Sequence, residues 1–291
     1  MDVRQLRCLV AIVDEGGFSS AARRLEMTQP AVSLQIARLE REIGNAVFLR
    51  NGRQVSLTAT GEILLPHARK AVRAFDDAQV AARLTQGVVS GSILMGTVPG
   101  CGGANVPDLL RDFRKAFPDV SMRVIEGSAD DLIRRVTNED VDIAIVGTTS
   151  PSSHGLPSRI ITETRLIAVA PREHGFARKS AIPLRALLEE TVMCTPEGSG
   201  IRAALDMARK PARLDLSIRY ESGNPDVLIR FAAVGLGIAI VPDGPELHTR
   251  EDVAAIEITD PLIWGRLEMI WSRQSETSPA VRELIRLAEM L

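Results

Sequence analysis

Apolar residues recur every three or four positions through the first forty-three residues, which is the spacing of one helical face. This spacing predicts a helix over residues 4–14, ended by a glycine pair, and a short second helix for which Ser19 is the expected N-cap. Thr28 is placed to cap a third helix, and Pro30 falls in its first turn, where the missing amide proton has no cost. The buried stripe of the third helix is then Val32, Ile36, Leu39 and Ile43.

A β-hairpin is predicted directly after the third helix. Two β-rich runs, 47–50 and 53–57, meet at Asn51-Gly52, a strong turn signal. Three helices followed by a hairpin that carries Arg50 and Arg53 have the order of a winged helix-turn-helix, in which the third helix enters the DNA major groove. On pattern alone, the same segment also suits a packing module with no nucleic-acid role.

A long amphipathic helix is predicted from about residue 58 to residue 86. Its apolar positions recur close to a heptad and are Leu65, Ala68, Val72, Phe75, Ala78 or Gln79, and Ala82. At about 1.5 Å per residue the helix would extend about 40 Å, more than a small module needs for its own core. Pairing of two such helices would place two third helices on one face of DNA. The alternative is an amphipathic helix that lies on its own domain.

From residue 91 onward the pattern changes to alternating strands and helices. The first set of apolar runs and amphipathic segments covers 92–98, 106–116, 120–126, 130–136 and 141–146. The second set covers 166–170, 184–188, 192–194, 201–209, 216–220, 227–234 and 235–242, followed by a strand at 267–271 and a helix at 278–291. This succession predicts parallel sheets covered by helices, in two α/β lobes whose interface is the default place for a small ligand.

Composition and charge narrow the functional classes. The chain has 291 residues, enough for two or three compact units, and a net charge of -2. Residues 1–88 hold 12 Arg and Lys against 9 Asp and Glu, so the attraction to DNA phosphates is concentrated in this part of the chain. This excess of positive charge is small, which indicates that two copies of the module are needed for high affinity. No signal-peptide core and no apolar run of about 20 residues is present, so we expect a cytoplasmic protein that engages no membrane.

Cysteines, histidines and enzyme motifs give little support for catalysis. Three cysteines without a CxxC pair and four histidines without ligand spacing lead us to expect no disulfide, no metal site and no cofactor. Cys101 and Cys194 fall near the predicted interface, where the role of a small buried hydrophobe is favoured over a redox role. Dinucleotide-binding glycines, a phosphate loop and a nucleophile elbow are absent, so we do not expect an enzyme. The missing signal peptide disfavours a transport-type solute-binding protein.

The amino-terminal segment closely resembles the winged helix-turn-helix of LysR-type transcriptional regulators. The matching residues are Leu6, Phe18, Ala21-Ala22, Leu25, Gln29-Pro30-Ala31-Val32-Ser33, Gln35-Ile36, Leu39-Glu40, Glu42-Ile43-Gly44, Phe48-Leu49-Arg50, Leu57-Thr58 and Gly61-Glu62. The resemblance implies DNA contacts by Thr28, Gln29, Pro30, Ser33, Leu34, Gln35, Arg38, Arg50 and Arg53. Leu34 stands where the family usually has arginine; it can touch a thymine methyl group but cannot bind guanine bidentately.

The same resemblance, weaker beyond residue 62, implies three domains: DNA-binding over 1–58, a linker (dimerisation) helix over 59–88 and an effector-binding domain over 89–291. The last would have the two lobes of periplasmic binding proteins, with 92–162 and 267–291 in lobe one and 163–266 in lobe two. The implied effector-binding residues are Thr97, Pro99, Gly100, Cys101, Gly127, Ser128, Gly147, Thr148, Thr149, Ser199, Gly200, Ile201, Arg202, Ser222 and Asn224.

Several of these effector positions are Gly, Ser or Thr just before helices, where free amide protons can hold a carboxylate or phosphate, so an anion is one kind of effector that they suit. For each segment alone, ordinary helix capping is the favoured alternative, and the segments together favour a ligand site because they fall at corresponding carboxyl ends of strands. Gly100 stands where the LysR family usually has a residue with a hydroxyl group, so one hydrogen bond expected between the protein and its effector is missing.

The expected fold class is therefore an α+β multidomain chain, and the expected function is a sequence-specific regulator whose promoter binding responds to a small-molecule effector. The expected partners are double-stranded promoter DNA, the effector, further copies of the chain in a homodimer or homotetramer, and RNA polymerase. An enzyme would instead turn over a metabolite, and a structural adaptor would bind neither ligand nor DNA.

Overall fold

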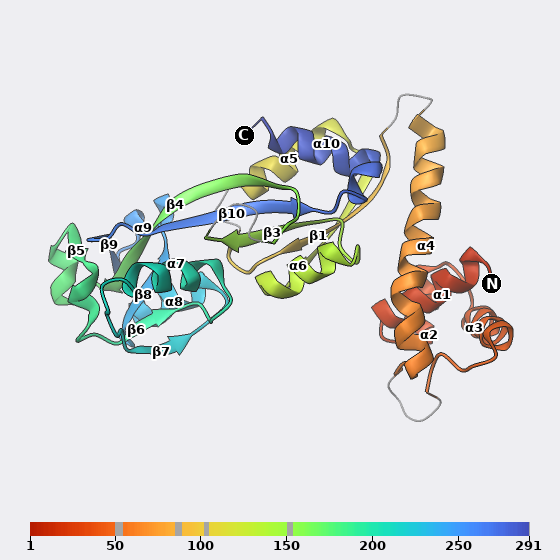
Figure 1. The fold of residues 1–291 in the computed structure, drawn as a ribbon, viewed down its shortest axis with the longest axis horizontal. Helices are drawn as coiled ribbons and strands as arrows, with labels where there is room; N and C mark the ends of the chain where they lie inside the picture. Colours follow the sequence, from red (N-terminus) through yellow and green to blue (C-terminus); the bar gives the residue numbers. More distant parts are fainter. Residues whose placement is uncertain (50–54, 85–88, 102–104, 150–153, 291) are drawn as a thin grey trace. The chain divides into compact units, whose positions relative to one another are not determined.

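The computed structural model describes residues 1–49, 55–84, 89–101, 105–149 and 154–290. The chain separates into two compact units, Met1–Gly91 and Ser92–Leu291, each with a core of its own (Figure 1). No helix within the described ranges combines the length and the apolar character needed to cross a membrane.

The described residues of the first unit form four helices: α1 (Val3–Asp14), α2 (Phe18–Arg24), α3 (Gln29–Ile43) and α4 (Ala59–Leu84). Asp2 and Gln5 form a reciprocal capping box at the start of α1. After α1, Gly16 has a φ of 71°, a left-handed conformation that glycine adopts without strain. The predicted N-cap at Ser19 was wrong, because the chain stays extended only to Gly17, which caps α2, and Ser19 lies in the first turn.

Helices α1, α2 and α3 enclose one apolar core. Leu9 and Ile12 of α1 share it with Val32 and Leu39 of α3, and all four side chains are fully buried. Ala21 of α2 is small enough to let a helix cross closely, and it too is fully buried. Burial of a large aliphatic side chain contributes about 1.5–3 kcal/mol relative to exposure. This core therefore fixes which face of α3 is turned to solvent.

The first half of α4 packs onto its own unit. Three of the predicted heptad positions lie in or against the core: Leu65, Ala68 and Val72. An ion pair adds to this packing, with Arg69 Nη2 at 2.7 Å from Asp14 Oδ1. Ile63 is 69% exposed and Phe75 is 42% exposed. The alternative of a helix lying on its own domain thus describes this half of α4, while two large apolar side chains remain uncovered.

The second unit is built on a ten-stranded sheet in the order β2-β1-β3-β10-β4-β8-β6-β7, with β9 paired to β4 and β5 paired to β9. The strands are β1 (Gly91–Thr97), β2 (Val120–Glu126), β3 (Ile143–Thr148), β4 (Ser158–Pro171), β5 (Ala181–Pro183), β6 (Val192–Cys194), β7 (Ile218–Glu221), β8 (Ile238–Pro242), β9 (Val253–Thr259) and β10 (Trp264–Trp271). The helices are α5 (Val106–Ala116), α6 (Ala129–Thr137), α7 (Gly200–Arg209), α8 (Pro225–Ala233), α9 (Pro245–Thr249) and α10 (Pro279–Ala288).

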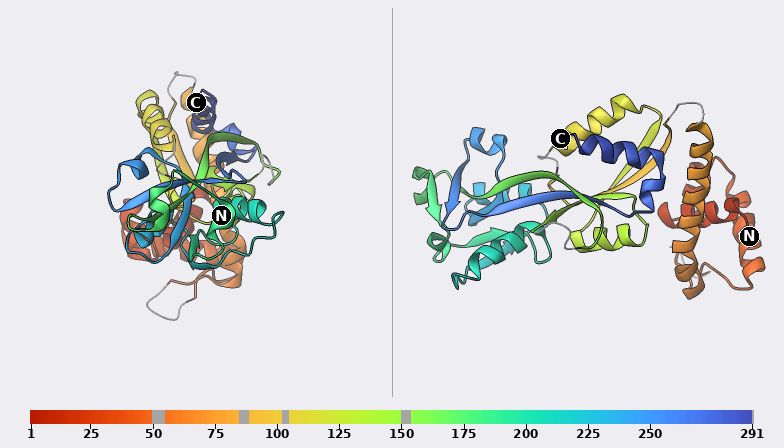
Figure 2. Two further views of the ribbon diagram at one scale, coloured as in Figure 1. Left: turned by 90° about the vertical axis from the view of Figure 1, so that its left-hand side faces the viewer. Right: turned by 45° about the horizontal axis from the view of Figure 1, so that its top comes forward.

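Two lobes share this sheet. Lobe one contains β1, β2 and β3 with α5, α6 and α10, and lobe two contains β5 to β9 with α7, α8 and α9. Figure 2 shows β4 and β10 as the long strands that run from one lobe into the other. Lobe one has a core that includes Leu132 and Ile270, and lobe two has cores around Leu205 and Leu228.

The sheet is mixed, so the prediction of parallel sheets alone was incomplete. β1 runs parallel to β3, and β6 runs parallel to β7 and β8. β4 and β10 run antiparallel to their neighbours, because each must cross between the lobes. Since the parallel strands of both lobes end at the same place, the loops that follow them face one another.

Several elements escaped prediction or extend beyond it. β4 begins at Ser158, ahead of the expected strand at 166–170, because Ile161 is the one buried position in its first half, so neither an apolar run nor a strict alternation marks this part of the strand. β9 and the short elements β5 and α9 were not predicted at all. α5 and β2 begin and end where the sequence placed them.

Candidate functional sites

The amino-terminal half of α3 carries a set of exposed or half-buried polar side chains. Thr28 Oγ1 accepts a hydrogen bond from the Ala31 amide at 3.4 Å, which caps the helix as predicted. The exposed residues among the predicted DNA contacts are Thr28, Gln29, Pro30, Leu34 and Arg38, and the half-buried ones are Ser33 and Gln35. Because the core holds the opposite stripe, these side chains share the faces of α3 that remain accessible.

The turn before α3 fixes its entry angle. Glu26 adopts a φ of 54°, and the Met27 amide donates to the Ala22 carbonyl at 2.9 Å. Gln35 lies half-buried on α3, and no donor among the described residues reaches its Oε1 atom, which is itself buried. Its Oε1 atom is therefore an unsatisfied buried acceptor, and a rotation of the side chain would be needed to present it to an outside partner.

Backbone pairing beside α3 supports the predicted wing. Phe48 and Leu57 form an antiparallel bridge, and the Leu49 amide donates to the Ser56 carbonyl at 2.8 Å. Glu40 Oε1 of α3 accepts from the Val47 amide at 2.8 Å, which ties the first arm of the hairpin to the helix. The predicted contacts Arg50 and Arg53 lie outside the described residues.

A cleft of about 730 Å³ lies between the two lobes of the second unit. Nine of the predicted effector-binding residues line it: Pro99, Gly100, Cys101, Gly127, Ser128, Gly147, Ser199, Gly200 and Ile201. They lie at or just beyond the carboxyl ends of β1, β2 and β3, or at the start of α7. The convergence of loops at the ends of parallel strands is the arrangement in which α/β proteins hold small ligands.

The other six predicted residues are not part of this lining: Thr97, Thr148, Thr149, Arg202, Ser222 and Asn224. Thr97 and Thr148 are buried at the ends of β1 and β3, because side chains alternate between the two faces of a strand. Thr149 lines a separate, largely apolar groove. Ser222 Oγ accepts from the Asn224 amide at 3.2 Å, and the Asn224 side chain caps α8, so both serve the local turn.

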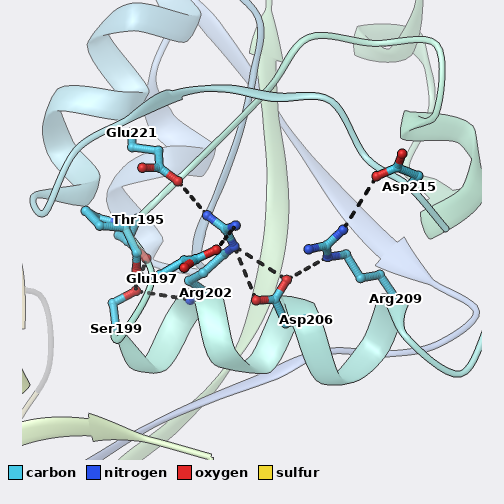
Figure 3. A network of polar contacts seen from close by, with 9 residues as sticks. Thr195, Glu197, Ser199, Arg202, Asp206, Arg209, Asp215 and Glu221 are labelled. Atoms are coloured by element: carbon cyan, nitrogen blue, oxygen red, sulfur yellow. Dashed lines mark hydrogen bonds and ion pairs between the residues drawn. The ribbon is translucent and has the colours of Figure 1, made fainter. Parts of the chain in front are cut away.

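Arg202 is itself buried, and its guanidinium lies among three carboxylates, of which Glu197 and Glu221 are exposed (Figure 3). Its guanidinium donates to Glu221 at 2.5 Å, to Glu197 at 3.3 Å and to Asp206 at 3.4 Å. Burial acts to lower the pKa of Arg202, but the hydrogen bond to Glu221 and the nearby carboxylate charges outweigh burial and raise it above its ordinary value. Three carboxylates thus satisfy this cation, which fastens the loop before α7 to the end of β7.

Sequence reasoning missed the part of the lining supplied by the crossing strands. These residues are Thr162, Glu163 and Thr164 of β4 and Gly265, Arg266 and Leu267 of β10. Arg266 Nε donates to Glu163 Oε1 at 2.7 Å, which joins the two strands beside the cleft. The polar run in the first half of β4 was the available signal, but it is informative only once β4 is known to cross between lobes.

Glycines bring the two lobes into backbone contact beside the cleft. A Cβ atom at Gly200 of α7 would lie 2.5 Å from the carbonyl carbon of Gly147 in β3. A Cβ atom at Gly100 would lie 2.5 Å from Pro225 Cδ at the start of α8. Each pair joins lobe one to lobe two, so the observed approach of the lobes requires that these positions carry no side chain.

The two cysteines of the second unit are held as thiols. Burial raises the pKa of Cys101, which lines the cleft, and raises the pKa of Cys194 to about 11. Because the thiolate is the reactive form, these shifts favour the predicted role as small hydrophobic side chains.

Both parts of the chain match models of known families. Residues 3–62 match the bacterial regulatory helix-turn-helix protein of the lysR family. Residues 86–290 match the LysR substrate binding domain. The two matches together cover most of the chain and leave residues 63–85, which include most of the long helix α4, between them.

Curated relatives and solved structures agree with these matches. The chain is 30% identical over 299 residues to the transcriptional regulator IlvR of Caulobacter vibrioides, covering 99% of this chain and 97% of that protein. It is 29% identical over 294 residues to the nitrogen assimilation regulatory protein nac of Escherichia coli, covering 98% and 94%. In fold it resembles full-length CbnR in complex with its target DNA, with a TM-score of 0.74, 18% identity and coverage of 100% and 99%. It also resembles a full-length OxyR variant from Pseudomonas aeruginosa, with a TM-score of 0.73, 20% identity and coverage of 99% and 94%.

Proposed function

Because this chain belongs to the LysR family of bacterial transcription regulators, we propose that α3 binds promoter DNA as one of a symmetric pair and that a small molecule in the interlobe cleft alters this binding. The observation that carries the proposal is the accessible amino-terminal half of α3. Hydrogen-bonding side chains stand there on a helix whose other face is locked into a core. A helix presented in this way, with a wing beside it, fits a major groove.

The residues of α3 divide the task of recognition. Gln29, Ser33 and Gln35 offer hydrogen bonds to base edges, and Arg38 offers its charge to phosphates. Leu34 is 49% exposed and provides an apolar contact suited to a thymine methyl group. For Arg50 and Arg53, a phosphate or minor-groove contact in the wing is proposed from the sequence alone.

Assembly follows from the uncovered part of α4. Ile63 is an exposed apolar side chain on α4, and Phe75, which continues the heptad stripe of the packed residues, is 42% exposed with the Arg7 guanidinium over its ring. Pairing of two α4 helices would cover them and give DNA-binding modules related by a two-fold axis, matching an inverted repeat. A homotetramer built as a dimer of dimers, contact with RNA polymerase and a cytoplasmic location beside the promoter complete the proposal.

Ligand binding in the interlobe cleft is the proposed cause of the change in DNA binding. A ligand that binds more tightly to one arrangement of the lobes shifts the population toward that arrangement. The resulting change in the assembly would alter its affinity for promoter DNA, or its bending of that DNA, by a coupling free energy. We expect saturable binding of the effector without turnover.

The test is footprinting on DNA taken from immediately upstream of the protein's own gene, with candidate metabolites present and absent. Ser33→Ala and Gln35→Ala each remove side-chain hydrogen bonds to base edges, so each should lower discrimination for the operator by about 1–3 kcal/mol per base pair read. Ser180→Ala and Gln274→Ala, at exposed positions in the second unit, are the matched controls and should leave protection unchanged. If the Ser33→Ala and Gln35→Ala variants protected operator DNA as the unmodified protein does, the proposal that α3 is the DNA-binding helix would be overturned.

A further inference from the structure

An apolar groove of about 800 Å³ lies on lobe two and shares no lining residue with the interlobe cleft. It runs between α7, with the segment that follows this helix, and the turn that joins β9 to β10. Its floor continues the core of lobe two: Ala204 and Ile263 are buried there, and Ala208 and Leu214 pack against the same cluster.

Three large apolar side chains of the groove walls are open to solvent. Met207 of α7 is 60% exposed, Leu262 is 50% exposed and Trp264 is 54% exposed. Together with the floor they form one apolar surface. A continuous exposed apolar patch marks an interaction site, and Met and Trp are enriched where proteins bind one another.

The open walls favour a segment of protein over a small molecule. A pocket for a small ligand encloses about 70–90% of the ligand surface. Here the wall side chains are themselves about half exposed, so a small ligand would stay largely in contact with water. An amphipathic helix laid beside α7 could cover all three wall side chains with apolar residues spaced three or four apart.

The charges at one end of the groove suit an acidic occupant. Arg185 and Asp260, the two charged residues of the described lining, face each other at 3.5 Å. Lys210 and Arg213 directly flank the lining residues 211–212 after α7, and both are exposed. Neither of these two cations forms an ion pair with another described residue. This end of the groove therefore has positive charge available to a partner.

The positive charge is local. Residues 89–291 hold 23 Arg and Lys against 28 Asp and Glu, so the second unit as a whole would repel an acidic segment. Complementary charge orients a partner and selects among partners more than it adds affinity. The two cations would thus fix the direction in which an acidic segment lies along the groove.

We propose that this groove binds an acidic amphipathic helix of a partner protein, with apolar side chains against Met207, Leu262 and Trp264 and carboxylates beside Lys210 and Arg213. This surface goes beyond the proposed function, which uses α3, α4 and the interlobe cleft. Its occupation leaves the residues that line the cleft and those on α3 free.

The test measures binding of two labelled synthetic helical peptides to the full-length protein by fluorescence anisotropy. In both peptides leucines recur at alternating intervals of three and four; the remaining positions are glutamate in the first peptide and lysine in the second. The glutamate peptide should bind saturably and about tenfold more tightly than the lysine peptide, and added salt should weaken its binding. Trp264 is 54% exposed and Trp271 is 7% exposed, so binding in the groove should shift the emission of the exposed tryptophan.

Substitutions in the apolar wall locate the binding. Met207→Ser and Leu262→Ser should each weaken binding of the glutamate peptide about tenfold, because each removes a large apolar side chain from the contact. Leu188→Ser is the matched control, since Leu188 is 43% exposed on lobe two but lies outside the groove lining. This variant should bind as the unmodified protein does.

Reversal of charge tests the acidic character of the partner. In the double variant Lys210→Glu with Arg213→Glu, the preference should reverse, so that the lysine peptide binds more tightly than the glutamate peptide. Arg178→Glu is the control for charge, because Arg178 is exposed on the same lobe and outside the groove lining. It should keep the preference for the glutamate peptide.

Four results would overturn the proposal. Three concern the peptides: no saturable binding of either one, equal binding of both, or full binding by the Met207→Ser and Leu262→Ser variants. The fourth is a change of oligomeric state in these two variants, measured by sedimentation velocity. That change would show that a second copy of this chain, in place of an acidic partner protein, covers the groove.

Discussion

The accessible surface of α3 and the interlobe cleft differ in how their residues are brought together. Every candidate DNA contact described in the structure belongs to one helix and its cap, and the direction of its side chain follows from core positions three or four residues away. The cleft takes its lining from both lobes and both crossing strands, between Val98 and Leu267. A surface on one helix keeps its shape as long as the helix is held. A cleft made by two lobes changes whenever one lobe moves, which suits it to a ligand-dependent change of state.

This difference predicts that core damage in the first unit leaves the cleft intact. Leu39 of α3 is fully buried, so Leu39→Ala should destabilise the first unit by about 2–5 kcal/mol through reduced burial and the cavity left behind. Operator binding should fall with it. Differential scanning calorimetry of the full-length protein should show the transition of the first unit shifted down while that of the second stays in place.

Leu34→Ala is the matched control, because Leu34 lies on the same helix and is 49% exposed. Its effect on stability should remain within about 0.5 kcal/mol. Equal shifts of both transitions in Leu39→Ala would show that the two units unfold together and that the contrast between them is not thermodynamic.

The converse change is a wedge between the lobes. In Gly200→Ala the new Cβ atom would lie 2.5 Å from the carbonyl carbon of Gly147, so the lobes must separate or strain, at a cost of about 1–3 kcal/mol. We expect operator binding without effector to persist and the response to effector to disappear. Small-angle scattering would detect the altered lobe arrangement, and footprinting would detect the missing response.

Gly223→Ala tests whether the contact itself matters. Gly223 lines the same cleft, but a Cβ atom there would meet no atom nearer than Pro99 Cγ at 3.9 Å. A normal response in this variant beside an absent response in Gly200→Ala supports the closure contact. An absent response in both would mean that the cleft tolerates no added methyl group anywhere, and the specific role of the Gly147 contact would have to be given up.

The same contrast explains which features the sequence revealed. α5 was predicted to the residue, because its strong periodicity is set by one buried face. β2 was also predicted to the residue, from its β-forming residues, although Val120 is its one buried position. The first half of β4 was missed because both of its faces carry exposed positions, and β9 was missed although most of it is buried. Alanines at 254 and 255 weaken the β signal of β9, so its burial depends on distant neighbours.

The candidate sites show the same difference between features set by the local sequence and features set by distant parts of the chain. The Thr28 cap was predicted because a helix cap is a local property of the chain, whereas the α3 contacts to DNA are implied by the family resemblance and stay a prediction. The helix start at Ser199 and Gly200 is likewise a local signal, but their place in the cleft was implied by the family resemblance. Glu163 and Arg266 were missed, since their place in the cleft depends on two strands that lie far apart in sequence and pair only in the fold. Local sequence patterns therefore could not predict the charge of the cleft lining.

A smaller change tests how tightly the local cap controls the DNA surface. In Thr28→Ala the hydrogen bond to the Ala31 amide is removed, which should cost about 1 kcal/mol and fray the first turn of α3. Thr28→Ser keeps the hydroxyl and should restore most of the stability. Operator affinity measured by fluorescence anisotropy should fall in the alanine variant and recover in the serine variant. Equal affinities in the two variants would show that the cap does not order the contacting residues.

The smallest expected effect is a pH dependence confined to the second unit. Burial acts to raise the pKa of Asp131 in α6, but hydrogen bonds from Arg135, at 2.6 Å, and from Arg134 outweigh it and lower the pKa below its ordinary value. A carboxyl group whose pKa is lower in the folded state adds stability above the unfolded pKa and loses it as pH falls through the folded pKa. The stabilisation by Asp131 should therefore be complete near neutral pH and decline below about pH 4.

Asp131→Asn isolates this contribution. The difference in melting temperature between the unmodified protein and the variant should be largest near neutral pH and shrink below about pH 4, in the transition of the second unit alone. Asp130→Asn removes the adjacent carboxylate, which makes no ion pair among the described residues, and should show a weaker trend. A difference that stays constant across the acid range would mean that the contribution of Asp131 does not depend on its ionisation. The ion pairs of α6 would then add nothing that depends on charge.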